Sequence, residues 1–264
     1  MTKIKEITDF LESIAPLHFQ ESYDNAGLIY GDEEAEISGV LISLDLTEEV
    51  LQEAIESDSN LVISHHPIIF RGIKKFTGHY VDRIVAMAIK NDIAIYAIHT
   101  NLDNVLDDGV NGKIAEILGL EETAILQVKK ELDENGRVGS GIIGNLKEPL
   151  APKDFLSYLK ERMELRVLKH TALLDAEIKK VAICGGSGSF LLDAATKAQA
   201  DVFITSDFKY HEFFDADGKI VVVDIGHYES ERFTINLLYD LLKEKFRKFA
   251  PRCTKVNTNP VKYY

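Results

Sequence analysis

Histidine and carboxylate side chains gather just after three apolar runs of the sequence. They are His65 and His66 after the run at 61–64, His99 and Asp103 after the run at 93–98, and His227 and Glu231 after the run at 220–225. Half of the eight histidines lie in these three places. Imidazole and carboxylate together suit divalent ions of zinc, iron, manganese, cobalt or nickel, whereas Ca²⁺ and Mg²⁺ prefer all-oxygen sites. The residue types therefore point to metal chemistry.

The elements that must position these side chains are strands of an α/β fold. Helix and strand patterns alternate along almost the whole sequence, which favours this class, with largely parallel sheets flanked by helices. The expected strands cover residues 40–44, 61–64, 93–98, 180–184, 201–205 and 219–224, and the expected helices cover residues 3–15, 80–90, 110–118, 153–164, 189–199 and 229–249. Ligands of a parallel α/β sheet bind outside the carboxyl ends of its strands. We therefore expect the three groups to converge on one crevice.

The adjacent pair His65 and His66 needs a special position to share a target, because successive side chains of a strand point to opposite faces. The end of a strand is such a position, because the pleat breaks there and Pro67 favours extended geometry at His66. Two imidazoles splayed at such an end can serve two nearby ions. The structural alternative is that one ring caps the strand and the other is solvated.

The other two groups also have structural alternatives. His99 and Asp103 lie in a strand-to-loop passage, where an Asx-type turn is an ordinary role for a carboxylate. His227 and Glu231 are four residues apart and share one face of a helix, which suits two ligands of one metal but also a simple capping pair. The metal interpretation is favoured because all three groups occur at the same end of an expected strand.

The chain divides into two expected lobes, residues 1–125 and 126–264. The boundary is placed near residue 125 because an expected hairpin around Asn135-Gly136 follows it. The long carboxyl-terminal helix, from about residue 229, is expected to pack back toward the first lobe, so that His227 and Glu231 reach His65 and Asp103.

Composition is that of a globular protein, with 45% apolar and 28% charged residues among 264. With 43 acidic against 30 basic residues the formal charge is −13, which disfavours general binding of nucleic acid. The two cysteines form no CxxC pair and suit a reducing compartment. Without a signal-peptide core or a run of ~20 apolar residues, we expect a cytoplasmic protein with no membrane segment.

Six motifs in order along the chain resemble the NIF-three-like (NGG-interacting factor three) family, also known as GTP cyclohydrolase I type two homologues. They include Ser64-His65-His66-Pro67, and the full set lies at residues 23–28, 64–67, 96–103, 184–189, 205–211 and 226–231. Two departures are Tyr23, where many relatives carry Trp, and Ser206-Asp207, where many carry Gly-Glu. The extra mid-chain domain of longer members is absent.

The resemblance implies a two-metal site between the two lobes. The ligands carried over by position are His65, His66, Asp103, His227 and Glu231, with Asp103 and Glu231 bridging the two divalent ions or completing their coordination. His99 would lie behind the ligands or face the substrate. The resemblance also implies a toroidal homohexamer with its metal sites facing an interior cavity.

These features predict a metal-dependent hydrolase that uses a metal-bridging hydroxide on a small substrate, for which a nucleotide is one candidate. His99 and His211 are the expected catalytic proton carriers, because the pKa of imidazole lies near neutral pH. Ring opening of GTP is expected from the resemblance alone. The alternative is a non-enzymatic metal-binding ring scaffold or interaction protein, and nucleic-acid binding ranks last.

The glycine run at 185–188 leaves two interpretations open. It follows an expected strand and precedes an expected helix, so its backbone amides could hold an anion. It lacks the lysine of a P-loop, and an ordinary tight turn explains it equally well.

Overall fold

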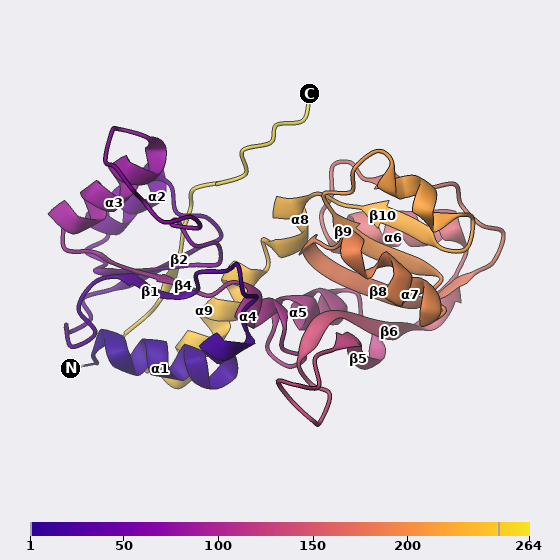
Figure 1. The fold of residues 1–264 in the computed structure, drawn as a ribbon, viewed down its shortest axis with the longest axis horizontal. Helices are drawn as coiled ribbons and strands as arrows, with labels where there is room; N and C mark the ends of the chain where they lie inside the picture. The colour runs from indigo at the N-terminus through magenta and orange to yellow at the C-terminus, as the bar shows by residue number, and fades with distance from the viewer. Residues whose placement is uncertain (1, 248) are drawn as a thin grey trace. The chain divides into compact units, whose positions relative to one another are not determined.

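The computed structural model describes residues 2–247 and 249–264, and its contacts divide the chain into two compact units (Figure 1). Unit 1 contains the chain up to Leu102 and from Thr234 onward, and unit 2 is Asp103–Phe233. The boundary expected near residue 125 falls inside strand β5 (Glu121–Val128), which pairs with β6 (Gly139–Leu150) in unit 2. The change of sequence character there coincides with an edge strand whose side chains are mostly exposed.

Unit 1 is built around a five-stranded sheet of order β1-β4-β3-β2-β11. The strands are β1 (Gly27–Tyr30), β2 (Val40–Ser43), β3 (Leu61–Ser64), β4 (Ala94–Ala97) and β11 (Arg252–Cys253). All pairs are parallel except that of β1 with β4. Every residue of β2, β3 and β4 is buried, as expected for parallel strands covered on both faces.

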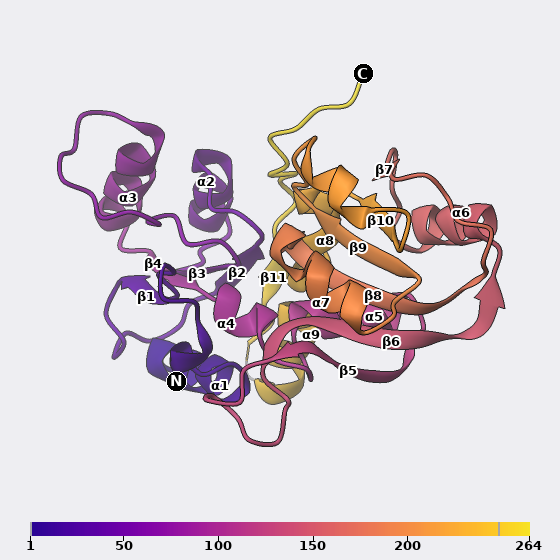
Figure 2. The ribbon, with the colours of Figure 1, turned by 45° about the vertical axis from the view of Figure 1, so that its right-hand side comes forward.

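Helices cover both faces of this sheet. Figures 1 and 2 show α2 (Glu48–Glu56) and α3 (Tyr80–Lys90) on one side, and α1 (Ile4–Ile14) and α9 (Thr234–Lys245) on the other. α9 packs on β2 and β11. The helix α2 begins after Thr47, whose hydroxyl accepts from the Val50 amide at 3.3 Å.

Unit 2 contains a six-stranded mixed sheet of order β5-β6-β8-β9-β10-β7. Its remaining strands are β7 (Lys169–His170), β8 (Ile178–Ser187), β9 (Val202–Ser206) and β10 (Val221–Asp224). Only β8, β9 and β10 are mutually parallel, and β5, β6 and β7 are antiparallel to their neighbours. The carboxyl ends of the three parallel strands are therefore the ends at which this unit can place a site.

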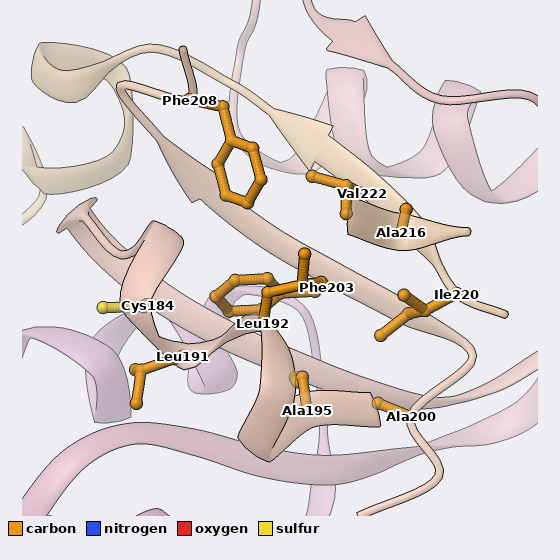
Figure 3. Packing of buried hydrophobic residues seen from close by; sticks show 11 residues of the cluster. Cys184, Leu191, Leu192, Ala195, Ala200, Phe203, Phe208, Ala216, Ile220 and Val222 are labelled. Atoms are coloured by element: carbon orange, nitrogen blue, oxygen red, sulfur yellow. The ribbon is translucent and has the colours of Figure 1, made fainter. Parts of the chain in front are cut away.

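The core of unit 2 lies between the parallel strands and the short helical segments that follow them. Figure 3 shows this cluster, in which Phe203 of β9 lies in register with Ala182 of β8 and Val222 of β10. Leu192 and Ala195, from α7 (Leu192–Lys197), cover it. The remaining helical segments are α4 (Thr100–Asp103), α5 (Val110–Ile117), α6 (Pro152–Arg162), α8 (His227–Glu231), and the 3₁₀ turns η1 (Leu17–Phe19), η2 (Ser189–Leu191) and η3 (Glu212–Ala216).

The predicted α/β class is confirmed, and the helix expected over 229–249 differs most from the structure. It is two helices, α8 and α9, separated by a turn at residues 232–233. Arg232, in this turn, donates to the Met163 carbonyl at 3.3 Å and pairs with Glu164 at 2.5 Å. α9 ends at Lys245, and Lys248 of the expected helix lies outside the described residues.

The glycine run also differs from expectation, because Gly185 and Gly186 belong to β8, which continues to Ser187. Within the described ranges, none of the helices has the length and apolar character that crossing a bilayer requires.

Candidate metal centre

Three histidines meet at the carboxyl ends of β3 and β4 in unit 1. His65 and His66 follow β3 directly, and His99 comes two residues after β4. Because Ser64 pairs with Ala97 in the parallel ladder, the residues beyond both strand ends come side by side. The ring centroids are 4.9 Å apart for His65 and His66, and 5.3 Å from each of these to His99. One ring nitrogen of each lies within 4.8 Å of the others, so an ion held by His65 and His66 would lie next to His99.

A hydrogen bond fixes the ring of His65. Its Nδ1 lies 2.8 Å from the carbonyl oxygen of Ile98, and His65 is fully buried. A carbonyl oxygen can only accept, so Nδ1 carries the hydrogen and Nε2 of the neutral ring keeps its lone pair. The tautomer suited to metal binding through Nε2 is therefore set by the backbone.

Carboxylates fix the other two rings of the trio. His66 Nδ1 lies 2.8 Å from Asp45 Oδ1, and His99 Nδ1 lies 2.7 Å from Asp24 Oδ1. The second oxygen of Asp24 accepts from the Thr100 amide at 3.0 Å and from the Thr100 hydroxyl. Burial acts to raise the pKa of Asp24, but the hydrogen bonds from His99 and Thr100 outweigh it and lower the pKa to about 2. Asp24 is thus an anion beside His99.

The donors of unit 2 lie on one helical turn that follows β10. In α8, His227 Nε2 lies 3.0 Å from Glu231 Oε2, while His227 Nδ1 lies 2.7 Å from Asp207 Oδ2. Gly226 precedes the helix with a φ of 91°, a conformation that favours glycine. Glu231 is only 3% exposed. The four-residue spacing read from the sequence therefore places both side chains together.

Asp103 joins this second group. It ends α4, its carbonyl accepts from Asn111 Nδ2 at 3.1 Å, and its carboxylate lies within 4.8 Å of that of Glu231. Burial raises the pKa of the Cys184 thiol, and the nearby charges of Asp103 and Glu231 raise it further. Unit 2 thus concentrates two carboxylates and one imidazole around the end of β8.

The glycine run has a structural role in this group. The Gly185 amide donates to Asn111 Oδ1 at 2.8 Å, and the Gly186 amide donates to Ser230 Oγ at 2.9 Å. A Cβ atom on Gly186, whose φ is +64°, would collide with Glu231 Oε1. These amides therefore bind the side chains of Asn111 and Ser230, and the absence of a side chain at Gly186 leaves room for Glu231.

Among the described residues, His211 belongs to none of the donor groups. It is exposed at the start of η3, with its ring centroid 5.2 Å from that of Tyr210 and 6.5 Å from that of Phe214. The proton-carrying role expected for it stays a prediction.

Sequence reasoning missed the three carboxylates that hold the imidazoles. Asp45 comes two residues after β2, and Asp207 comes directly after β9, so the strand-end criterion used for the histidines also selects them. Asp24 follows no strand, and it was noted only within the motif at 23–28. Its pairing with His99, 75 residues away, is visible only in the fold.

Comparison with known proteins gives one consistent family. The family model described as Duf34/NIF3 (NGG1p interacting factor 3) matches residues 2–260. A protein of Clostridium perfringens named GTP cyclohydrolase 1 type 2 homolog is 35% identical over 247 residues, covering 92% of each chain. Among solved structures, a hypothetical protein of Staphylococcus aureus has a TM-score of 0.91 and 30% identity, with 99% of each chain covered. A Bacillus cereus protein related to NIF3 has a TM-score of 0.90 and 25% identity, covering 100% of this chain and 99% of that one.

Proposed function

Because the chain belongs to the Duf34/NIF3 (NGG1p interacting factor 3) family, we propose that it binds two divalent metal ions and hydrolyses a small molecule. One observation carries the proposal. Each of the four histidines in the two donor groups has its Nδ1 held by a carbonyl or a carboxylate, at 2.7–2.8 Å. Metal-binding histidines are oriented in this way, because the anchored ring presents Nε2 and the partner strengthens it as a ligand.

We assign the ligands to five residues, which are His65, His66, Asp103, His227 and Glu231. This set offers three imidazoles and two carboxylates, and carboxylates can bridge a pair of ions. Such ions, when bound, lower the pKa of water toward ~7 and polarise a carbonyl, imine or phosphoryl oxygen of the substrate. The mixed ligand set favours zinc, iron, manganese, cobalt or nickel.

His99 would then handle the proton. Its Nε2 is the ring atom that can take a proton from water or give one to a leaving group, since Nδ1 is bound to Asp24. Asp24 remains an anion because its pKa is lowered to about 2, and its contact with Nδ1 fixes the orientation of the His99 ring. An imidazole between a buried anion and the reacting centre is suited to general acid–base catalysis.

The test is metal content together with turnover. We expect about two transition-metal ions per chain by plasma mass spectrometry, and loss of metal in His65→Ala. His170→Ala is the matched control, because His170 is exposed on β7. Phosphoesters, amides and nucleotides, including GTP, should be screened with and without a chelator. Full hydrolysis by metal-free His65→Ala protein would rule out the mechanism.

The same experiment addresses the non-enzymatic alternative. Stoichiometric metal with no turnover of any tested class would favour a metal-binding scaffold. The name GTP cyclohydrolase 1 type 2 homolog belongs to the relative, and GTP is one substrate of the screen on that ground.

We also propose that the chain assembles with itself into a homohexamer, as the family resemblance implies. Phe190, Tyr210 and Phe214 of unit 2 are large and exposed, and self-assembly is a natural way to cover such side chains. Light scattering should give about six times 29.6 kDa. Cys184 and Cys253 are free thiols, which fits a protein working in the reducing cytoplasm.

A further inference from the structure

Two neighbouring aromatic side chains lie exposed, and one of them is close to His99. Tyr23 is 62% exposed and Phe70 is 46% exposed. Their ring centroids are 6.1 Å apart with planes tilted by 52°, and the Phe70 centroid is 6.2 Å from that of His99. Aromatic rings contribute most to stability when buried, so a neighbouring exposed pair is a surface available to a ligand ring.

The segments that carry this aromatic pair are tied to the histidine trio. Asp24, next to Tyr23, binds His99 at 2.7 Å. Asn25 Nδ2 donates at 2.7 Å to the carbonyl oxygen of Ile69, the residue before Phe70. The backbones that support both rings are therefore fixed relative to each other and to His99, which lowers the entropy lost when a ligand binds.

The loop beyond Phe70 is basic in an acidic protein. Arg71, Lys74 and Lys75 are exposed, and residues 70–76 contain no carboxylate, whereas the whole chain carries a formal charge of −13. In the part of the chain that the structure describes, no ion pair involves these three cations. Such a local concentration of positive charge attracts anions.

We propose that Tyr23, Phe70 and the basic loop 71–75 bind a flat aromatic ring that carries a negatively charged group, and present it to His99. Ring stacking on Tyr23 and Phe70 and charge pairing with Arg71, Lys74 or Lys75 recognise the two parts of this ligand. The inference rests on the proposed function in that the ligand is taken as the substrate of the same centre.

The absence of tryptophan from the sequence allows a direct test. Tyr23→Trp introduces a single tryptophan at the site, and Val167→Trp introduces one at a 42% exposed position in unit 2. We expect guanosine monophosphate to quench the fluorescence of the first variant saturably and to leave the second nearly unchanged. Equal quenching of both would overturn the proposal, because it would reflect collisions only.

Four probes separate the ring from the charge. Guanosine monophosphate and phenyl phosphate carry both features, guanosine has only the ring, and ribose 5-phosphate has only the anion. By calorimetry, the first two should bind more tightly than the last two. Phe70→Ala should weaken guanosine monophosphate binding roughly tenfold, while Phe70→Tyr should restore it. Lys74→Gln with Lys75→Gln should weaken the phosphates but not guanosine. Unchanged affinity in Phe70→Ala would overturn the proposal.

The ring-binding proposal and the proposed hydrolase function can fail independently of each other. Phe70→Ala should keep the full metal content, because Phe70 is not among the assigned ligands. Saturable quenching of Tyr23→Trp in a protein without metal would support the ring site while the hydrolase proposal failed. Metal-dependent turnover with no response of Tyr23→Trp would do the reverse. An oligonucleotide that binds far more tightly than the mononucleotide would overturn the small-molecule assignment.

Discussion

At the scale of single residues, the chemistry of each imidazole depends on the group that contacts its Nδ1 atom. His65 is held by the Ile98 carbonyl, whereas His66 is held by the Asp45 carboxylate. An anion strengthens the imidazole as a base and as a ligand more than a neutral carbonyl does. The two adjacent histidines are therefore chemically different although their sequence context is nearly the same.

Gly186 gives the sharpest prediction at this scale. Gly186→Ala places a methyl group against Glu231 and should lower metal content as well as stability. Gly218→Ala is the matched control, because Gly218 has the same φ of +64° with open space around it. The control should lose about 1 kcal/mol of unfolding free energy from the left-handed backbone alone, and Gly186→Ala a further ~1–3 kcal/mol from the collision. Chemical denaturation and metal analysis measure both effects. Equal behaviour of the two variants would contradict this account.

At the scale of elements, the carboxyl-terminal segment contacts the residues that hold the candidate metal ligand His66. Thr258 Oγ1 donates to Asp45 Oδ2 at 2.7 Å, and the other oxygen of Asp45 binds His66. Thr258 and Pro260 also line a cavity of about 460 Å³ that includes His66. A segment far from the histidines in sequence thus helps to orient one of them.

Thr258→Val should therefore weaken metal binding, because Asp45 loses a partner and His66 its firm orientation. We expect a loss of up to about tenfold, at the lower end of the ~10–100-fold effect of removing a ligand's direct partner. Thr258→Ser should restore affinity. Thr254→Val is the control, since Thr254 binds Glu53 instead. Competition with a metal chelator measures the metal affinities. Equal losses of affinity in Thr258→Val and Thr254→Val would contradict the prediction, because they would show that either substitution only destabilises the segment.

The sequence predicts elements well where one pattern dominates. The helix expected at 80–90 and the strand expected at 61–64 match α3 and β3, because caps and continuous apolar runs mark them. It fails for β1 and β11, the two edge strands of the unit 1 sheet, because a strand that is only partly buried or two residues long depends on its single neighbour. It also misses the break between α8 and α9, because the amphipathic pattern continues across residues 232–233.

The candidate site shows the same limit. Residue types and strand ends select the donor histidines and carboxylates, since these signals are local. The pairs Asp24–His99 and Asp207–His227 depend on contacts across 75 and 20 residues, for which the sequence carries no spacing signal. Sequence therefore predicts which chemistry is present, and the fold reveals what orients it.

At the scale of the whole molecule, the assigned ligands come from both units. His65 and His66 belong to unit 1, whereas Asp103, His227 and Glu231 belong to unit 2. A ligand that binds only the native state stabilises every part of the structure that must be folded to hold it. Metal held by either donor group should therefore stabilise the unit that holds it.

Metal removal should lower the melting temperature of the protein. At a free ion concentration of 100 times Kd the stabilisation is about 2.7 kcal/mol, which corresponds to roughly 5–10 °C for a chain of this size. Calorimetry with and without a chelator measures the shift, and adding back the metal should reverse it. His65→Ala should melt at the same temperature with or without the chelator. A chelator effect of equal size in His65→Ala would show that the ion acts elsewhere, because the variant lacks an assigned ligand. Hydrogen exchange would show which segments the metal stabilises. Metal removal should speed exchange in α8 of unit 2 and in the segment after β3 of unit 1.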